Sequence, residues 1–185
     1  MSAQRKDSPE KTVAEQMAAE TGIDVRKCYQ CGKCTAGCPM VPEMDYTPSQ
    51  IMRLVQIGDR EAALRSATIW YCASCLTCST RCPQEVKIAE FMDALRERSL
   101  KAKKVNPRAR KIIAFVKSFL GGIRRAGRVH EISMVMEYKT RARDLFSDVL
   151  LAPVMFVKGK LKLLGKPVKD RQAVARIFER TAGAK

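Results

Sequence analysis

The sequence lacks a long apolar run. Its longest apolar stretch extends from Val149 to Val157 and is interrupted by Pro153, whereas a helix that crosses a membrane needs about 20 consecutive apolar residues. The stretch from Met1 to Lys11 is polar and charged and has no apolar segment of the kind found in secretory signals. We therefore expect a cytoplasmic protein without direct membrane insertion.

The residue types and patterns of common catalytic sites are also scarce. Aromatic residues make up only 6% of the chain, and His130 is the one histidine. Because His130 is far from every cysteine in sequence, we interpret it as a surface or packing residue. No Ser-His-Asp set, glycine-rich phosphate loop or paired catalytic carboxylates are recognisable. We therefore predict no catalytic residue in this chain.

The alternation of apolar and polar residues that is typical of β-strands is absent, and helical periodicity dominates. Thr47, Pro48 and Gln50 fit the cap, first position and capping box of a helix. Asp59 fits the cap of the next. Further helices are predicted at Lys11–Glu20, Val86–Lys103, from Asn106 to a break at Gly121-Gly122, Val129–Arg143, Leu145–Leu151 and Val168–Thr181. The expected fold class is all-α.

Charge divides the chain near residue 100. Residues 1–100 contain 13 Lys or Arg and 13 Asp or Glu, so their charges cancel. Residues 101–185 contain 22 Lys or Arg and only 6 Asp or Glu, which accounts for the whole net charge of +16. This asymmetry indicates that the two parts have different roles.

The eight cysteines are the most informative feature, because all of them fall in two short runs and none is left over. The first run consists of Cys28, Cys31, Cys34 and Cys38, and the second of Cys72, Cys75, Cys78 and Cys82. Each run has the spacing C-x2-C-x2-C-x3-C-P, closed by Pro39 and Pro83. The two runs form an internal repeat, which suggests a pseudo-twofold pair of sites.

This spacing is the bacterial ferredoxin pattern for [4Fe-4S] clusters. Three cysteines at this stride can reach three iron corners of one cubane, and the fourth cysteine ligates the other cluster in two-cluster proteins. We therefore predict two [4Fe-4S] clusters with crossed ligands. One cluster is assigned to Cys28, Cys31, Cys34 and Cys82, and the other to Cys72, Cys75, Cys78 and Cys38.

Two other uses of the cysteines are less compatible with the pattern. Structural zinc is usually held by paired C-x2-C units from separate loops, which does not suit three cysteines in stride followed by Cys-Pro. Disulfides would need an oxidising compartment. Around the runs, Gly32 and Gly37 are expected to let the backbone approach the cluster sulfides, whereas Trp70 and Tyr71 are expected to serve in packing.

The two runs, C-Y-Q-C-G-K-C-T-A-G-C-P and C-A-S-C-L-T-C-S-T-R-C-P, together with the helical segment between them, resemble the C subunit of heterodisulfide reductase. They also resemble the α-helical ferredoxin domains of succinate dehydrogenase iron–sulfur subunits and of anaerobic glycerol-3-phosphate dehydrogenase. The resemblance is strong over residues 24–100 and weak beyond. It implies an α-helical ferredoxin module over residues 24–103, preceded by a tail and short helix at 1–23 and followed by a basic helical extension at 104–185.

The same resemblance implies a role in electron transfer within a soluble heterodisulfide reductase-like complex. Two expected partners are a subunit with flavin and iron–sulfur groups, which splits electron pairs, and a cysteine-rich catalytic subunit. A hetero-oligomer is expected, with a dimer of heterotrimers as one possible form. The chain has no Cys-Cys pair of the kind found in the catalytic partner, so catalysis is assigned to that partner. The alternative is a free-standing ferredoxin-type carrier, an iron–sulfur regulator, or an iron–sulfur subunit of another anaerobic dehydrogenase.

The basic second half has three candidate explanations: partner docking, an ordinary solvated surface, and binding to nucleic acid or to an anionic membrane. Aromatic residues are sparse there, and no nucleic-acid recognition motif is visible. We therefore favour partner docking and expect no nucleic-acid partner.

Overall fold

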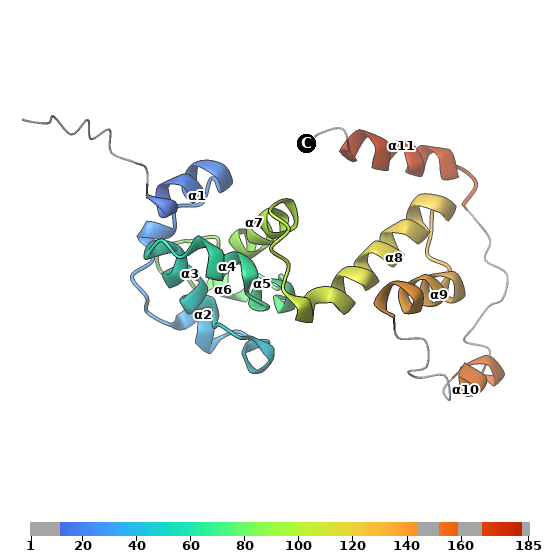
Figure 1. Cartoon of the computed structure of the whole chain (residues 1–185), viewed down its shortest axis with the longest axis horizontal. Helices are drawn as coiled ribbons and strands as arrows, with labels where there is room; N and C mark the ends of the chain where they lie inside the picture. Colours follow the sequence, from blue (N-terminus) through green and yellow to red (C-terminus); the bar gives the residue numbers. More distant parts are fainter. Residues whose placement is uncertain (1–11, 144–151, 159–167, 183–185) are drawn as a thin grey trace, which may run out of the picture. The chain divides into compact units, whose positions relative to one another are not determined.

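In the computed structural model, the described residues are 12–143, 152–158 and 168–182. They form helices and connecting turns, and no strand occurs among them, in agreement with the all-α prediction (Figure 1). The chain divides into two units, with the boundary between Ala109 and Arg110. Each unit is described by itself.

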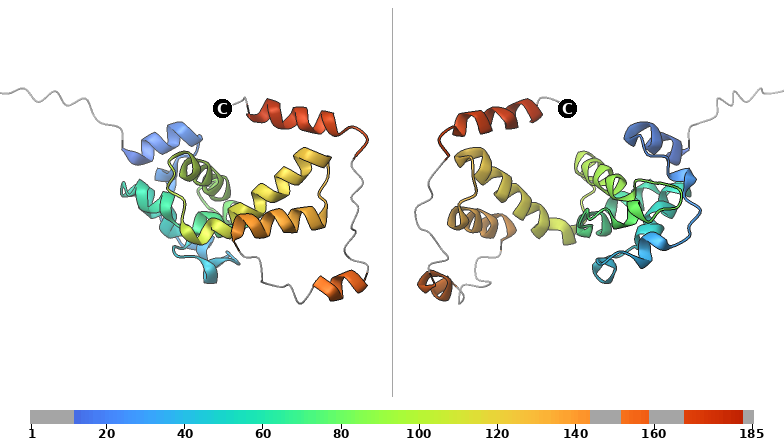
Figure 2. Two further views of the ribbon diagram at one scale, coloured as in Figure 1. Left: turned by 45° about the vertical axis from the view of Figure 1, so that its right-hand side comes forward. Right: turned by 180° about the vertical axis from the view of Figure 1, so that it is seen from behind.

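The first unit consists of short helices around the two cysteine runs (Figure 2). Its helices are α1 (Val13–Thr21), η1 (Val25–Lys27), α2 (Lys33–Ala36), η2 (Val41–Glu43), α3 (Pro48–Gln56), α4 (Arg60–Arg65), α5 (Thr68–Tyr71), α6 (Thr77–Thr80), α7 (Ile88–Lys101) and η3 (Pro107–Ala109).

The predicted helix caps of this unit are confirmed. Thr47 and Gln50 form a complete capping box at the start of α3, with Pro48 at the first helical position. The side chain of Asp59 accepts a hydrogen bond from the N–H of Ala62 at 2.9 Å and so caps α4. These side chains satisfy backbone N–H groups that have no partner inside the helix, which is why each helix begins where the sequence indicated.

Helices α3 and α7 supply much of the apolar core, and they do so in parallel ways. Each helix follows one cysteine run, and in each helix the buried apolar residues lie on one face. The fully buried side chains include Ile51, Met52 and Val55 on α3, and Phe91, Met92 and Leu95 on α7. The order and spacing of these positions are the same in both helices, so the repeat seen in the cysteine runs extends into the helices that follow them.

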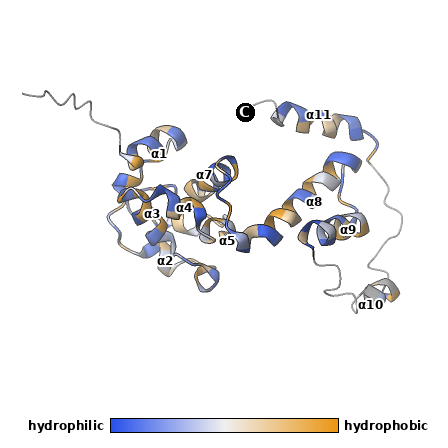
Figure 3. Ribbon diagram, viewed as in Figure 1, coloured by the Kyte–Doolittle hydropathy of each residue, from blue (hydrophilic) through white to orange (hydrophobic). Residues whose placement is uncertain are grey.

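The second unit contains α8 (Arg110–Ala126), α9 (Glu131–Ala142), α10 (Ala152–Val157) and α11 (Arg171–Ala182). Helix α8 packs against both α9 and α11. In Figure 3, α8 shows apolar and polar patches along its length, as expected for an amphipathic helix.

One helix prediction in this unit is wrong, because α8 continues through Gly121-Gly122 to Ala126 instead of breaking there. Ala114, Ser118 and Gly122 recur at one-turn spacing and are the buried residues of α8. Small side chains at these positions allow close packing, which offsets the roughly 1 kcal/mol that a glycine costs inside a helix. The helix predicted at Leu145–Leu151 lies outside the described residues.

Candidate iron–sulfur sites

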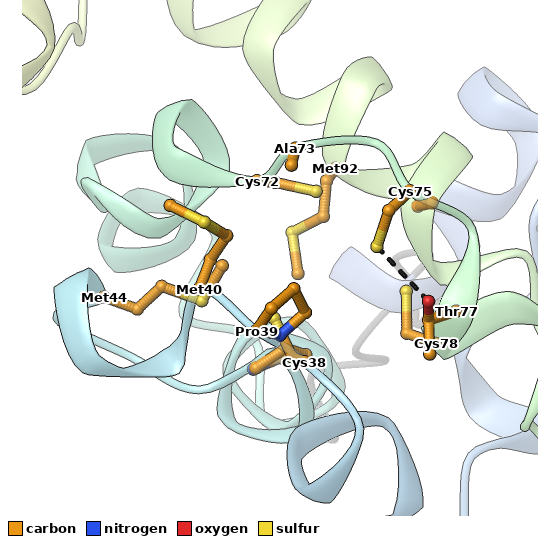
Figure 4. A pocket seen from close by; sticks show the side chains of 12 residues that line it. Cys38, Pro39, Met40, Met44, Cys72, Ala73, Cys75, Thr77, Cys78 and Met92 are labelled. Atoms are coloured by element: carbon orange, nitrogen blue, oxygen red, sulfur yellow. Dashed lines mark hydrogen bonds between the residues drawn. The ribbon is translucent and has the colours of Figure 1, made fainter.

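The structure gathers the eight cysteines into two groups of four, and each group lines one cavity. The first cavity is lined by Cys28, Cys31, Cys34 and Cys82, together with Gln30, Gly32, Lys33, Ser49 and Ile88. The second is lined by Cys38, Cys72, Cys75 and Cys78, together with Pro39, Met40, Met44, Pro48, Ala73, Thr77, Ala89 and Met92. Figure 4 shows the four cysteines of the second cavity around a common space. Each cavity therefore combines three cysteines of one run with the last cysteine of the other.

The two cavities are related by the internal repeat. Helix α3 follows the first run in the way that α7 follows the second, so Ser49 corresponds to Ala89 and Pro48 corresponds to Ile88. Ser49 and Ile88 line the first cavity, whereas Ala89 and Pro48 line the second. Each cavity is therefore lined by one residue from the start of α3 and one from the start of α7, and the position used on each helix differs between the two cavities. In addition, α2 of the first run packs against α6 of the second. This is the arrangement expected of a pseudo-twofold axis that passes between the sites.

Left-handed backbone conformations shape both cysteine loops. In the first loop Gln30 has φ 62° and Gly32 has φ 76°, and the corresponding residues of the second loop, Ser74 and Leu76, have φ 49° and 62°. Two left-handed residues in so short a stretch reverse the chain direction, which bends the loop around a central space. Gly32 adopts this conformation without strain, whereas Leu76 carries the steric cost of a side chain at positive φ.

The cysteine side chains lie in contrasting environments. Cys34 is buried and Cys78 is half-buried, and burial raises the pKa of the Cys34 thiol and raises that of Cys78 to about 11. Cys75 is exposed, and hydrogen bonding to the hydroxyl and N–H of Thr77 lowers its pKa. The Cys75 thiol lies 3.4 Å from Thr77 Oγ1 (Figure 4). The buried thiols need a metal partner to become thiolates at neutral pH.

Hydrogen bonds from nitrogen reach two further sulfurs. Gln30 Nε2 donates to Cys28 Sγ at 3.4 Å, and the N–H of Val86 donates to Cys82 Sγ at 3.4 Å. Such N–H···S contacts stabilise negative charge on a cluster ligand. Both contacts belong to the first cavity.

The residues of the two cavities fit a polynuclear iron–sulfur group. The donors are soft thiols, and the residues that line the second cavity include no acidic side chain. Among the described residues no three Cys, His, Asp or Glu side chains converge as they would on a single ion. A cubane spreads its thiolates farther apart, because each binds a different iron.

Comparisons with known proteins identify the domain that contains these cysteines. Residues 24–86 match the family model of the 4Fe-4S dicluster domain. They form a 4Fe-4S dicluster domain. All eight cysteines lie within it, so the prediction of two [4Fe-4S] clusters is confirmed. The dicluster domain lies within the first structural unit.

Curated relatives extend the similarity beyond the dicluster domain. The chain is 32% identical over 112 residues, 60% of each chain, to a protein of Methanothermobacter marburgensis named as the C subunit of H(2):CoB-CoM heterodisulfide,ferredoxin reductase. It is 41% identical over 85 residues to the iron-sulfur C subunit of the CoB–CoM heterodisulfide reductase of Methanopyrus kandleri, covering 46% of this chain and 43% of that protein. The resemblance to the C subunit of heterodisulfide reductase is thereby confirmed. The match spans about 60% of the length of the first of these relatives.

Other predictions near the site have clear outcomes. Trp70 is buried, as its assigned packing role requires, and its indole N–H has no acceptor among the described residues. The ring of Tyr71 lies under the guanidinium of Arg108, with 5.4 Å between Arg108 Cζ and the ring centroid. Gly37 lies against the side chain of Arg81, which is its counterpart in the repeat. Only one member of this pair can carry a large side chain at that contact.

Sequence reasoning did not identify three polar residues that support the cysteine loops. Asp45, Gln56 and Arg96 each bind backbone groups of a loop or of the helix that leads into it. A single polar side chain in a turn, as for Asp45, or on a helix, as for Gln56 and Arg96, carries no motif, so only the folded structure reveals its partners. Separately, no helix in the described ranges is both long and apolar enough to cross a membrane.

Proposed function

We propose that this chain is the electron-transfer iron–sulfur subunit of a heterodisulfide reductase-like complex of the cytoplasm. The grouping of all eight cysteines into two neighbouring quartets carries this proposal. When bound, the two clusters supply one-electron redox chemistry. The names of the relatives, each the C subunit of a heterodisulfide reductase, support the same role.

In this proposal the ligands are crossed between the runs. Cys28, Cys31, Cys34 and Cys82 hold one cluster, and Cys72, Cys75, Cys78 and Cys38 hold the other. The composition of the two cavities supports this assignment, because each contains one of these sets. With four thiolates on each cubane, no iron is left open to a substrate. Two-electron cleavage of a disulfide needs an open metal site, a redox dithiol or a flavin, so this step belongs to a partner.

The proposed path runs from a flavin-containing partner, through this chain, to a cysteine-rich catalytic partner, in a hetero-oligomer such as a dimer of heterotrimers. The second structural unit offers a surface for one of these contacts. Phe115, Val116, Phe119 and Leu120 on α8 are 38–46% exposed, and residues 101–185 carry the whole positive excess of the chain. Apolar side chains within a basic surface favour a partner with an apolar patch and an acidic rim.

Truncation tests the docking role, and the structure indicates where to cut. Residues just beyond Lys103 belong to the packing of the first unit: Asn106 Nδ2 donates to the carbonyl of Arg65 at 2.7 Å, and Ala109 is fully buried. A chain that ends after Arg110 keeps these contacts. We expect it to retain about eight irons per chain, two cubanes' worth, and to lose co-elution with the flavin-containing and catalytic partners.

A surface variant provides a milder form of the same test. Replacing Phe115 and Phe119 by Ser should weaken co-elution, whereas Ile177→Ser on α11, where the side chain is 59% exposed, is the matched control. Loss of iron in the truncated chain would make the second unit part of the cluster fold. Undiminished co-elution of both variants would move the docking surface elsewhere. A full-length chain that elutes alone from native cells would support the free-standing carrier instead.

A further inference from the structure

The two cysteine loops are held by equivalent side chains of different charge. At the end of α3, Gln56 Nε2 donates to the carbonyl oxygens of Val25 at 3.0 Å and Cys28 at 2.7 Å. On α7, the guanidinium of Arg96 donates to the carbonyl oxygens of Ile69 and Cys72. Cys72 corresponds to Cys28 in the repeat, and Ile69 corresponds to Val25. The same pair of backbone carbonyls is therefore bound in both halves of the domain.

The equivalence extends to a third contact. Gln56 Oε1 accepts a hydrogen bond from Gln30 Nε2 at 3.3 Å, and Arg96 Nη1 donates to Ser74 Oγ at 3.4 Å. Gln30 and Ser74 are the corresponding left-handed residues of the two loops. Gln56 and Arg96 thus do the same structural work, and the main difference between them is that the amide is neutral and the guanidinium is positively charged.

We propose that Arg96 is a positioning residue that places a fixed positive charge beside the second cysteine run and so raises the reduction potential of the cluster that Cys72 binds. This inference rests on the ligand assignment of the proposed function. Reduction adds one negative charge to a cluster, and a nearby positive charge stabilises the reduced form. Net charge and hydrogen bonds around a cluster are among the factors that set its potential.

Other charged groups around the two runs act differently. Lys27 precedes the first run and Lys33 lies within it, where it lines the first cavity, but both are exposed, so water and salt screen their charges. The side chain of Arg96 is only 24% exposed. Asp93 pairs with Arg96, with 2.7 Å between Asp93 Oδ1 and Arg96 Nη1, and its own side chain is 52% exposed. The guanidinium is bound to the carbonyl of Cys72, whereas the more exposed carboxylate of Asp93 contacts the loop at Ser74, whose Oγ donates to Asp93 Oδ1 at 3.1 Å.

The test is an anaerobic redox titration of the full-length protein, followed by electron paramagnetic resonance, with Cys72→Ser used to assign the signals. Arg96→Gln places at this position the side chain that the first loop already uses. We expect it to keep both clusters and to lower the equilibrium constant for reduction of the assigned cluster by about threefold to tenfold, tenfold being about 59 mV for one electron. Arg96→Lys, which retains the charge, should shift the potential less.

Asp93→Asn provides a test of opposite sign. It removes the negative partner and leaves Arg96 in place, so the potential of the same cluster should rise. Arg65→Gln is the control for loss of a positive charge, because Arg65 is exposed on α4 and its side chain binds Glu61 at 2.8 Å; it should leave both potentials unchanged.

An unchanged potential in Arg96→Gln with both clusters present would overturn the inference, as would equal shifts in the Gln and Lys variants. If Arg96→Gln loses its clusters, Asp93→Asn decides: a raised potential supports the inference and an unchanged one refutes it. The reduction potentials are measured on the protein without its partners, so failure of this inference can be distinguished from failure of the proposed docking role. If Cys72→Ser affects neither cluster signal, the ligand assignment itself is wrong.

Discussion

Asp45 holds the approach to the second cysteine run, and its replacement should weaken the first unit more than an ordinary helix-cap mutation. Its carboxylate accepts hydrogen bonds from the N–H of Ala67 at 2.7 Å, the hydroxyl of Ser66 at 2.7 Å, and the N–H and hydroxyl of Thr68 at 2.9 Å and 2.7 Å. These donors lie at the start of α5, which ends next to Cys72. Asp45 therefore joins the segment after the first run to the helix that precedes the second.

The expected loss of stability in Asp45→Ala depends on which of these donors can bind another acceptor. Thr68 has other acceptors, because its hydroxyl also bonds to the carbonyl of Tyr46 and its N–H to Ser66 Oγ. In Asp45→Ala, the N–H of Ala67 and the hydroxyl of Ser66 lose their acceptor, and both residues are at most 1% exposed. A buried donor without an acceptor costs about 1–3 kcal/mol. We expect Asp45→Ala to lower the free energy of unfolding by about 3 kcal/mol.

Asp45→Asn removes the charge and one of the two acceptor oxygens. The amide oxygen can still accept from Ser66 and Thr68, which donate to Oδ1, whereas the amide nitrogen replaces Oδ2, which accepts from the N–H of Ala67. Burial alone would raise the pKa of Asp45, but the hydrogen bonds from Ala67, Ser66 and Thr68 outweigh it and lower the pKa from 3.8 to about 2. At about 1.4 kcal/mol for each pKa unit, this shift would correspond to at most about 2.5 kcal/mol. Because Asp45 is exposed, solvent screens its charge and reduces the contribution of the charge to stability to about 1 kcal/mol. Asp45→Asn should therefore cost less than Asp45→Ala.

The charge contribution also has a defined pH dependence. The folded-state pKa lies below the unfolded value, so the contribution is complete above about pH 4 and is lost as the pH falls through about 2. The difference in unfolding free energy between the wild type and Asp45→Asn should narrow over that range. Acid effects on the clusters that are common to both proteins cancel in this difference.

The assay is anaerobic urea unfolding followed by circular dichroism, with Asp59→Ala as the matched control. Asp59 caps α4 through a hydrogen bond to the N–H of Ala62, and loss of such a cap costs about 1 kcal/mol. Equal losses in Asp45→Ala and Asp59→Ala would refute the role of Asp45 as a multiple acceptor. A loss in Asp45→Asn as large as that in Asp45→Ala would refute a contribution from the hydrogen bonds that Oδ1 accepts from Ser66 and Thr68.

Two further predictions concern the cysteine loops. Cys82→Ser should disturb the paramagnetic signal that Cys28→Ser also disturbs, although the two residues belong to different runs; if it changes the signal altered by Cys72→Ser and spares the other, the crossed assignment is wrong. Gly32→Ala should destabilise the protein by about 1 kcal/mol in urea unfolding, because its φ of 76° disfavours a side chain. Leu76→Ala at the equivalent position, where a side chain is already present at positive φ, should change stability less; equal losses would show that backbone strain is not the cause.

Local sequence patterns were enough to predict the cofactor and the fold class. Cysteine spacing is a local property that directly reflects the geometry of a cubane, so two runs of C-x2-C-x2-C-x3-C-P were sufficient to predict two clusters. Helix caps are equally local, which is why Thr47 and Asp59 marked the starts of α3 and α4 correctly. Gly121-Gly122 failed as a break because packing around α8 overrode local propensity.

The side chains that support the cysteine loops became identifiable in the folded structure. Asp45 acts on Ala67 and Thr68, and Arg96 acts on Ile69 and Cys72, across distances in sequence that no motif records. Their hydrogen bonds depend on how the helices cross, and any polar residue at such a position looks like a solvated one in the sequence. The exchange of equivalent helix residues between the two cavities is likewise a property of the fold, since it arises when α3 and α7 each contribute to both sites.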